Sequence, residues 1–275
     1  MAIKDILFHM RPSEAGESTT EFASSLAAIT GSHLTAAGVA LESLPPIDVQ
    51  DSASFTLLRE YSAKLRDDAE KAYLRFAAAV PPGVQTDLVV IQAYSQTAGE
   101  QFSELARHFD LSVVGQCLPE STEEDQLVLT GALFGSGKPV FIVPRNRTGP
   151  TKLTKAMVCW DGGIPAARAL AGALPLLSRA GCVEVVRLNR EREQIDDFPG
   201  FNVTRHLARH GINATLRTLA PADDVGGAIL SHADDSGADY LVLGAYGHWR
   251  LRELIFGGTT RTILASMKVP VFMSH

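Results

Sequence analysis

A cluster of glycines and basic side chains follows the apolar run at residues 240–243. Glycine tolerates a positive φ and leaves its backbone N–H uncovered, so glycine-rich backbone can approach a phosphate closely. The same residues could instead serve only the turns of a strand–loop–helix connection, and their spacing alone leaves both interpretations open. The glycines are Gly244, Gly247, Gly257 and Gly258, and the basic residues between the two pairs are His248, Arg250 and Arg252.

Two threonines, Thr259 and Thr260, follow the last glycine, where a helix is predicted over residues 260–267. A helix N-terminus offers free N–H groups and the positive end of the helix dipole, which together favour an anion. Either threonine could cap this helix or contact a phosphate. The segment has neither the Gly-Lys-Ser/Thr of a P-loop nor the compact GxGxxG of a dinucleotide-binding turn. Any phosphate site here is therefore of another kind.

Strands and helices alternate along the second half of the sequence. This alternation predicts parallel strands with right-handed crossovers, and the nearly continuous apolar strands indicate that helices cover both faces of the sheet. The strands are predicted at residues 155–160, 183–188, 213–219, 240–243 and 269–273, and the helices at 166–180, 201–210, 222–236 and 260–267.

Three of these strands end at candidate site residues. In a doubly wound sheet, ligands bind beyond the carboxyl ends of the strands, where the strand order reverses. Asp161 and Gly162 follow the first strand, Leu188 ends the second, and Gly244 follows the fourth. The glycine cluster therefore lies where a ligand is expected.

The two halves of the sequence resemble each other. FDLSVVG at 109–115 is similar to ADYLVLG at 238–244, and KPVFIVP at 138–144 is similar to VPVFMSH at 269–275. Such self-similarity indicates a duplicated unit. The join lies in the stretch 144–152, which is rich in proline, glycine and charge. We therefore expect two tandem α/β sandwiches, at residues 1–148 and 149–275.

Composition and charge exclude several classes of function. The formal net charge is −6, so a broad basic surface for nucleic acid is not expected. No apolar run reaches the roughly 18–20 residues that span a bilayer, and the N-terminal stretch lacks the pattern of a signal peptide, which together predict a cytoplasmic protein. The three cysteines show no CxxC spacing, so we expect reduced, buried thiols and no metal site.

The stretch GAYGHWRLRELIFGG resembles the phosphate-binding motif of the universal stress protein family, which is Gly, two residues, Gly, nine residues, Gly, then Ser or Thr. Gly244, Gly247 and Gly257 fall on its three glycines. CWDGGIPAARAL resembles the first strand and turn of the family, and KVPVFMSH resembles its last strand. The resemblance covers the chain as two tandem units and is much weaker in the first.

The resemblance implies a five-stranded, Rossmann-like parallel unit of the adenine nucleotide alpha hydrolase type. It also implies ATP as a ligand, with Mg²⁺ arriving on the phosphates. Asp161, with Gly162 beside it, would reach the adenosine, and the backbone near Leu188 would meet the adenine edge. Gly258 stands where the family has Ser or Thr, which removes a hydroxyl ligand. The phosphates would be surrounded by Gly244, Gly247, His248, Arg250, Gly257, Gly258, Thr259 and Thr260.

The first half lacks this motif. Arg11 stands in its first turn where the second half has an aspartate, and Gly115 is followed by Gln-Cys-Leu-Pro. An acidic run at residues 120–125 would repel a polyphosphate and is predicted to be a solvated, mobile loop. We therefore expect the first half to keep the fold without the nucleotide site and to serve as the pairing partner of the second half.

Three functions remain open at this point. The leading one is a stress-response module that binds ATP or a related adenine nucleotide in the second half and acts through partners or oligomeric state. The alternatives are a slow ATP hydrolase, for which His248 is the one loose candidate base, and a ligand-free scaffold. No catalytic residue is expected, so an enzyme is the less favoured interpretation. The segments 138–144 and 269–275 are expected to pair within one chain, each covering the other's sheet edge, and a homodimer is a further option.

Overall fold

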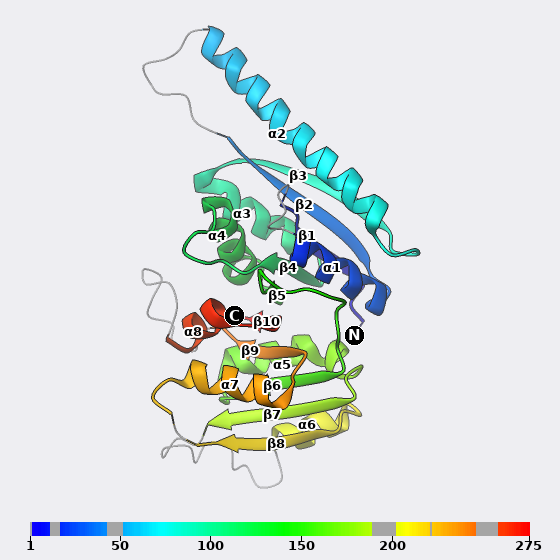
Figure 1. Ribbon diagram of the computed structural model, residues 1–275, viewed down its shortest axis with the longest axis vertical. Helices are drawn as coiled ribbons and strands as arrows, with labels where there is room; N and C mark the ends of the chain where they lie inside the picture. Colours follow the sequence, from blue (N-terminus) through cyan, green and yellow to red (C-terminus); the bar gives the residue numbers. More distant parts are fainter. Residues whose placement is uncertain (1, 12–16, 43–51, 189–201, 221, 246–257) are drawn as a thin grey trace. The chain divides into compact units, whose positions relative to one another are not determined.

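The computed structural model describes residues 2–11, 17–42, 52–188, 202–220, 222–245 and 258–275 (Figure 1). These residues form two compact units. The N-terminal unit consists mainly of Ile3–Lys138 with Thr148–Thr151, and the C-terminal unit mainly of Lys152–His275 with Pro139–Arg147. Each unit contains a sheet with helices, which confirms the predicted α/β fold class.

The N-terminal unit has a parallel sheet in the order β3-β2-β1-β4. The chain moves outward from β1 to β2 and β3 and then places β4 on the other side of β1, so the strand order reverses between β1 and β4. The strands are β1 (Asp5–His9), β2 (His33–Glu42), β3 (Thr86–Tyr94) and β4 (Leu111–Gly115). The helices are α1 (Glu17–Thr30), α2 (Ser52–Ala79), α3 (Ser95–Ala106) and α4 (Glu123–Thr130), with a π-helical turn η2 (Gly131–Gly135).

The C-terminal unit has the strand order β5-β10-β9-β6-β7-β8. Its strand order reverses between β6 and β9, in the same way as between β1 and β4. All of its pairs are parallel except β5 with β10. The strands are β5 (Val140–Val143), β6 (Lys155–Cys159), β7 (Cys182–Leu188), β8 (Ala214–Leu219), β9 (Tyr240–Gly244) and β10 (Val271–Ser274). The helices are α5 (Ile164–Leu177), α6 (Val203–Arg209), α7 (Val225–Ser236) and α8 (Gly258–Ser266).

Strand β5 belongs to the C-terminal unit although it precedes the join in the sequence. It pairs antiparallel with β10, with Phe141 opposite Phe272. The ring of Phe141 lies 5.2 Å from that of Phe272 and 6.0 Å from that of Tyr240, and all three side chains are fully buried. Strand pairing and aromatic packing therefore hold Pro139–Arg147 in the C-terminal unit. The two segments expected to pair, 138–144 and 269–275, contribute these two strands.

Helix ends differ from the predicted ones by a few residues, because side-chain caps fix them. The Asn202 side chain accepts a hydrogen bond from the N–H of Arg205, so α6 begins at Val203. The Asp224 side chain likewise accepts from the N–H of Gly227, and α7 begins at Val225. Helix α7 ends at Ser236, as predicted, and a left-handed Gly237 follows it. Within the described part of the chain, no helix combines the length and apolar character needed to cross a membrane.

The cysteines are free thiols with different exposure. Cys159 is buried and Cys117 is half-buried, and burial raises the pKa of each thiol to about 12. Cys182 is exposed, so the expectation of buried thiols is wrong at this position. Cys182 is the first residue of β7, where the chain enters the sheet from solvent.

Candidate functional site

The reversal between β6 and β9 brings three predicted site residues to one edge of the sheet. Asp161 and Gly162 follow the carboxyl end of β6, and Gly244 ends the neighbouring β9. Hydrogen bonding continues beyond the strand ends, because the N–H of Trp160 donates to the Val186 carbonyl at 2.8 Å and that of Ala245 to the Ser274 carbonyl at 2.8 Å. The edge on which a ligand is expected is therefore held in register.

Asp161 is fixed by a tight turn. Its Oδ1 accepts a hydrogen bond from the N–H of Gly163 at 2.8 Å, and Gly162 has a φ of +72°, which a residue with a side chain rarely adopts. The carboxylate is exposed to solvent. A carboxylate held in this way can accept hydrogen bonds from ribose hydroxyls or from an amino group on a base.

Gly244 is required by packing. A Cβ at this position would lie 2.3 Å from the backbone nitrogen of Ala166 and 2.6 Å from the carbonyl carbon of Pro165. The end of β9 therefore touches the first turn of α5 directly, and the structural interpretation accounts for this glycine without any ligand. The same contact brings the N-terminus of α5 to the reversal point. Its N-cap residue, Gly163, has no side chain to occupy the free N–H groups.

The N-terminus of α8 carries the other described part of the glycine cluster. Gly258 is exposed, and a Cβ there would meet no described atom within 4 Å. Thr259 is half-buried, whereas Thr260 is only 6% exposed and lies in the interior. A Cβ at Gly226 of α7 would lie 2.6 Å from the Cβ of Thr262, so α8 is anchored on α7. Gly258 and Thr259 are therefore the residues of this helix start that a ligand can reach.

Leu188 ends β7, two residues beyond the Val186 that pairs with Cys159, and so lies at the same sheet edge as Asp161. The other predicted site residues lie outside the described residues. They are Gly247, His248, Arg250 and Gly257.

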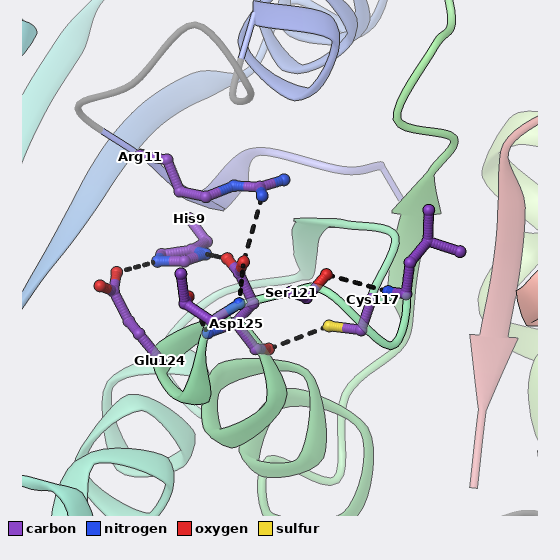
Figure 2. A network of polar contacts seen from close by, with 8 residues as sticks. His9, Arg11, Cys117, Ser121, Glu124 and Asp125 are labelled. Atoms are coloured by element: carbon purple, nitrogen blue, oxygen red, sulfur yellow. Dashed lines mark hydrogen bonds and ion pairs between the residues drawn. The ribbon is translucent and has the colours of Figure 1, made fainter.

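The acidic run of the N-terminal unit is only partly a loop, which corrects the prediction from sequence. Its residues 123–125 begin helix α4 (Figure 2). The side chain of Thr122 accepts from the N–H of Asp125, and that of Asp125 accepts from the N–H of Thr122, which forms a capping box. The spacing Thr-x-x-Asp before an apolar run was the sequence signal for it.

Charged side chains fill the reversal point of the N-terminal unit, where the sequence has Arg11 in place of Asp161. Arg11 Nη1 donates to Asp125 Oδ2 at 3.2 Å, and His9 Nε2 lies 2.7 Å from Glu124 Oε1 (Figure 2). A Cβ at Gly115 would lie 2.1 Å from Arg11 Nη2, so the guanidinium fills the place beside this glycine. The acidic residues are thus partly neutralised within the protein.

Comparisons with known proteins agree with this geometry. A family model described as the universal stress protein family matches residues 152–275. A universal stress protein of Synechocystis sp. is 26% identical over 142 residues, which cover 49% of this chain and 46% of that protein. The chain thus spans about half the length of this curated relative.

Two solved structures are similar over nearly the whole chain. A universal stress protein from Archaeoglobus fulgidus has a TM-score of 0.73 at 17% identity, covering 98% of this chain and 97% of that one. One from Pseudomonas aeruginosa, named as putative, has a TM-score of 0.56 at 17% identity, covering 99% and 93%. At this identity the likeness shows the fold, which both units share. The match to the universal stress protein family model covers residues 152–275, within the C-terminal unit.

Proposed function

We propose that the C-terminal unit binds an adenine nucleotide, ATP or a related one, and that the protein acts through it as a cytoplasmic stress-response module. One observation carries the proposal. In a unit whose sequence matches the universal stress protein family, an exposed, turn-held Asp161 lies at the reversal point of the strands, next to the uncapped N-terminus of α5. Ligands of doubly wound sheets bind at this point.

Each part of the proposed site has a chemical role. The Asp161 carboxylate accepts hydrogen bonds from the adenosine, with Gly162 allowing the turn, and the backbone at Leu188 faces the adenine edge. The free N–H groups at the start of α8, at Gly258 and Thr259, suit the phosphates, as helix N-termini favour anions. The proposed phosphate contacts are completed by Gly244, Gly247, His248, Arg250, Gly257 and Thr260, and a Mg²⁺ ion would be held by the phosphates.

The test is binding. Purified protein is heat-denatured and the supernatant is analysed for adenine nucleotide, and the melting temperature is measured with and without ATP and Mg²⁺. A ligand at about 100 times its Kd adds roughly 2.7 kcal/mol of stability, which is readily seen as a shift. The proposal is refuted if no nucleotide co-purifies and ATP with Mg²⁺ does not shift the melting temperature.

Asp161→Ala tests the assignment of the site. We expect weaker ATP binding by about tenfold or more, because a hydrogen bond to a charged group is worth about 1.5–3 kcal/mol. Asp161→Asn is the matched control, since it retains an oxygen that can accept from the N–H of Gly163 and so preserves the turn. Unchanged ATP affinity in the alanine variant would remove Asp161 from the site.

A ligand-free interaction scaffold is the second candidate, and one observation favours it. Gly244 is explained by its contact with Pro165 and Ala166 alone. The two candidates differ in the same experiment, because a scaffold gives no nucleotide-dependent shift in melting temperature.

A further inference from the structure

The reversal point of the N-terminal unit contains buried donors without acceptors. It lies between β1 and β4, where Arg11 follows β1, Gly115 ends β4 and α1 begins nearby in space. The side chain of Arg11 is only 10% exposed. Its Nη1 binds Asp125, but its Nε is buried and has no hydrogen-bond partner among the described residues.

Thr19 supplies a second group of the same kind. It is the third residue of α1, is 1% exposed, and its hydroxyl is buried without a partner in the part of the chain that the structure describes. The hydroxyl lies 3.1 Å from the position of a Cβ on Gly115, and Arg11 Nη2 lies 2.1 Å from the same position. Both groups therefore surround one point at the first turn of a 14-residue helix.

Buried polar groups are nearly always hydrogen-bonded, so the unpaired Nε of Arg11 and hydroxyl of Thr19 near Gly115 call for a partner. The guanidinium edge offers donors in a fork that matches an oxyanion, the hydroxyl adds a third donor, and the helix N-terminus favours negative charge. We propose that the N-terminal unit binds a small oxyanion of the phosphate or sulfate class between Arg11 and Thr19. This proposal is independent of nucleotide binding in the C-terminal unit.

The surrounding side chains limit the ligand. Asp125 takes the other side of the guanidinium at 3.2 Å and His9 engages Glu124 at 2.7 Å, so both nearby carboxylates already have partners in the protein (Figure 2). The carboxylate of Asp125 still competes for the guanidinium, which weakens binding without preventing it. Arg11 also fills the place beside Gly115. Because the guanidinium occupies this place, the proposed ligand is a free oxyanion and not one attached to a nucleoside.

The experiment measures the melting temperature in sodium phosphate against sodium chloride at equal ionic strength. It uses the full-length protein, and the Arg11 and Thr19 variants distinguish phosphate bound in the N-terminal unit from phosphate bound in the C-terminal unit. We expect phosphate to stabilise this protein more than chloride does. Thr19→Val removes only the hydroxyl, and Arg11→Ala removes the guanidinium; each should weaken apparent phosphate affinity by about tenfold to a hundredfold. Thr19→Ser is the matched control and should retain binding.

Asp125→Asn should change the phosphate affinity in the opposite direction. The amide oxygen can still accept from the N–H of Thr122, but the competing charge is gone, so phosphate affinity should rise. Equal stabilisation by phosphate and chloride would overturn the proposal, and so would wild-type phosphate affinity in Thr19→Val, which keeps the proposal testable if Arg11→Ala fails to fold. Stabilisation by AMP without stabilisation by inorganic phosphate would overturn it too, since the site then accepts a nucleoside.

Discussion

Restoring a hydroxyl at position 258 should strengthen nucleotide binding. Gly258 stands where the family motif has Ser or Thr, and a Cβ there meets no described atom within 4 Å. Its φ lies outside the left-handed region, so a side chain introduces no backbone strain. A Gly258→Ser substitution therefore adds one donor at the exposed start of α8, at little steric cost.

The expected gain in ATP affinity depends on the solvent exposure of position 258. A hydrogen bond to a charged group is worth about 1.5–3 kcal/mol, and we take about 1–1.5 kcal/mol because water competes at this exposed position. The dissociation constant for ATP with Mg²⁺ should fall about five- to tenfold. Titration calorimetry at 25 °C measures it directly. With adenosine, which has no phosphate, the variant should bind as the wild type does.

Gly258→Ala is the control, because it adds the Cβ without the hydroxyl. Both substitutions should raise stability slightly, by about 0.4–1 kcal/mol, since glycine is the more flexible residue in the unfolded chain. The affinity for ATP should distinguish the serine variant from the alanine variant. If the alanine variant gains as much ATP affinity as the serine variant, or if neither gains any while the wild type binds ATP, the assignment of a phosphate to this helix start is refuted.

Three further predictions concern packing in the C-terminal unit and the reactivity of the cysteines. Gly244→Ala should destabilise the C-terminal unit by about 1–3 kcal/mol, because its Cβ would lie 2.3 Å from backbone of α5; an unchanged melting temperature would contradict this contact. Phe141→Ala should cost about 3–5 kcal/mol in urea unfolding, since the ring is fully buried against Phe272; a loss below about 1 kcal/mol would contradict the placement of β5. At pH 8 a thiol reagent should modify Cys182 alone in the folded protein, because burial raises the pKa of Cys117 and Cys159 to about 12; rapid labelling of all three would disprove it.

Those raised thiol pKa values also set a pH dependence of stability. In the unfolded chain a thiol loses its proton near pH 8.5, before the folded protein does, so the unfolded state binds fewer protons above that pH. The contribution of the two thiols to stability is therefore complete below about pH 8.5 and declines as the pH rises toward 12.

Most of the fold was accessible from sequence because buried parallel strands are uninterrupted apolar runs. The runs at β6, β7 and β9 were located to within a residue or two at each end. Helix starts were less accurate, because the caps at Asn202 and Asp224 move them by two or three residues. The acidic run was misassigned since its charges were weighed and its Thr122–Asp125 capping box was not.

Only part of the candidate site could be predicted from the sequence. The alternation of elements predicts parallel strands, whose carboxyl ends share one edge of the sheet, and so places Asp161 and Gly244 at the same edge. The contact of Gly244 with Ala166, and the position of Arg11 against Gly115, depend on distances between a helix and a strand end. No periodicity in the sequence encodes such distances. The assignment of β5 to the second unit is likewise a pairing between distant segments.

The exchange of short segments between the units has a consequence for work with fragments. A fragment that begins at residue 149 keeps β10 but lacks β5, so one edge of β10 is left bare and free to recruit the same edge of another copy. It also removes Thr151 from Ser25 and Phe22 of the N-terminal unit, to which it is hydrogen-bonded. Each unit contains a short segment from the other half of the sequence, so a fragment cut at residue 149 lacks part of the corresponding unit.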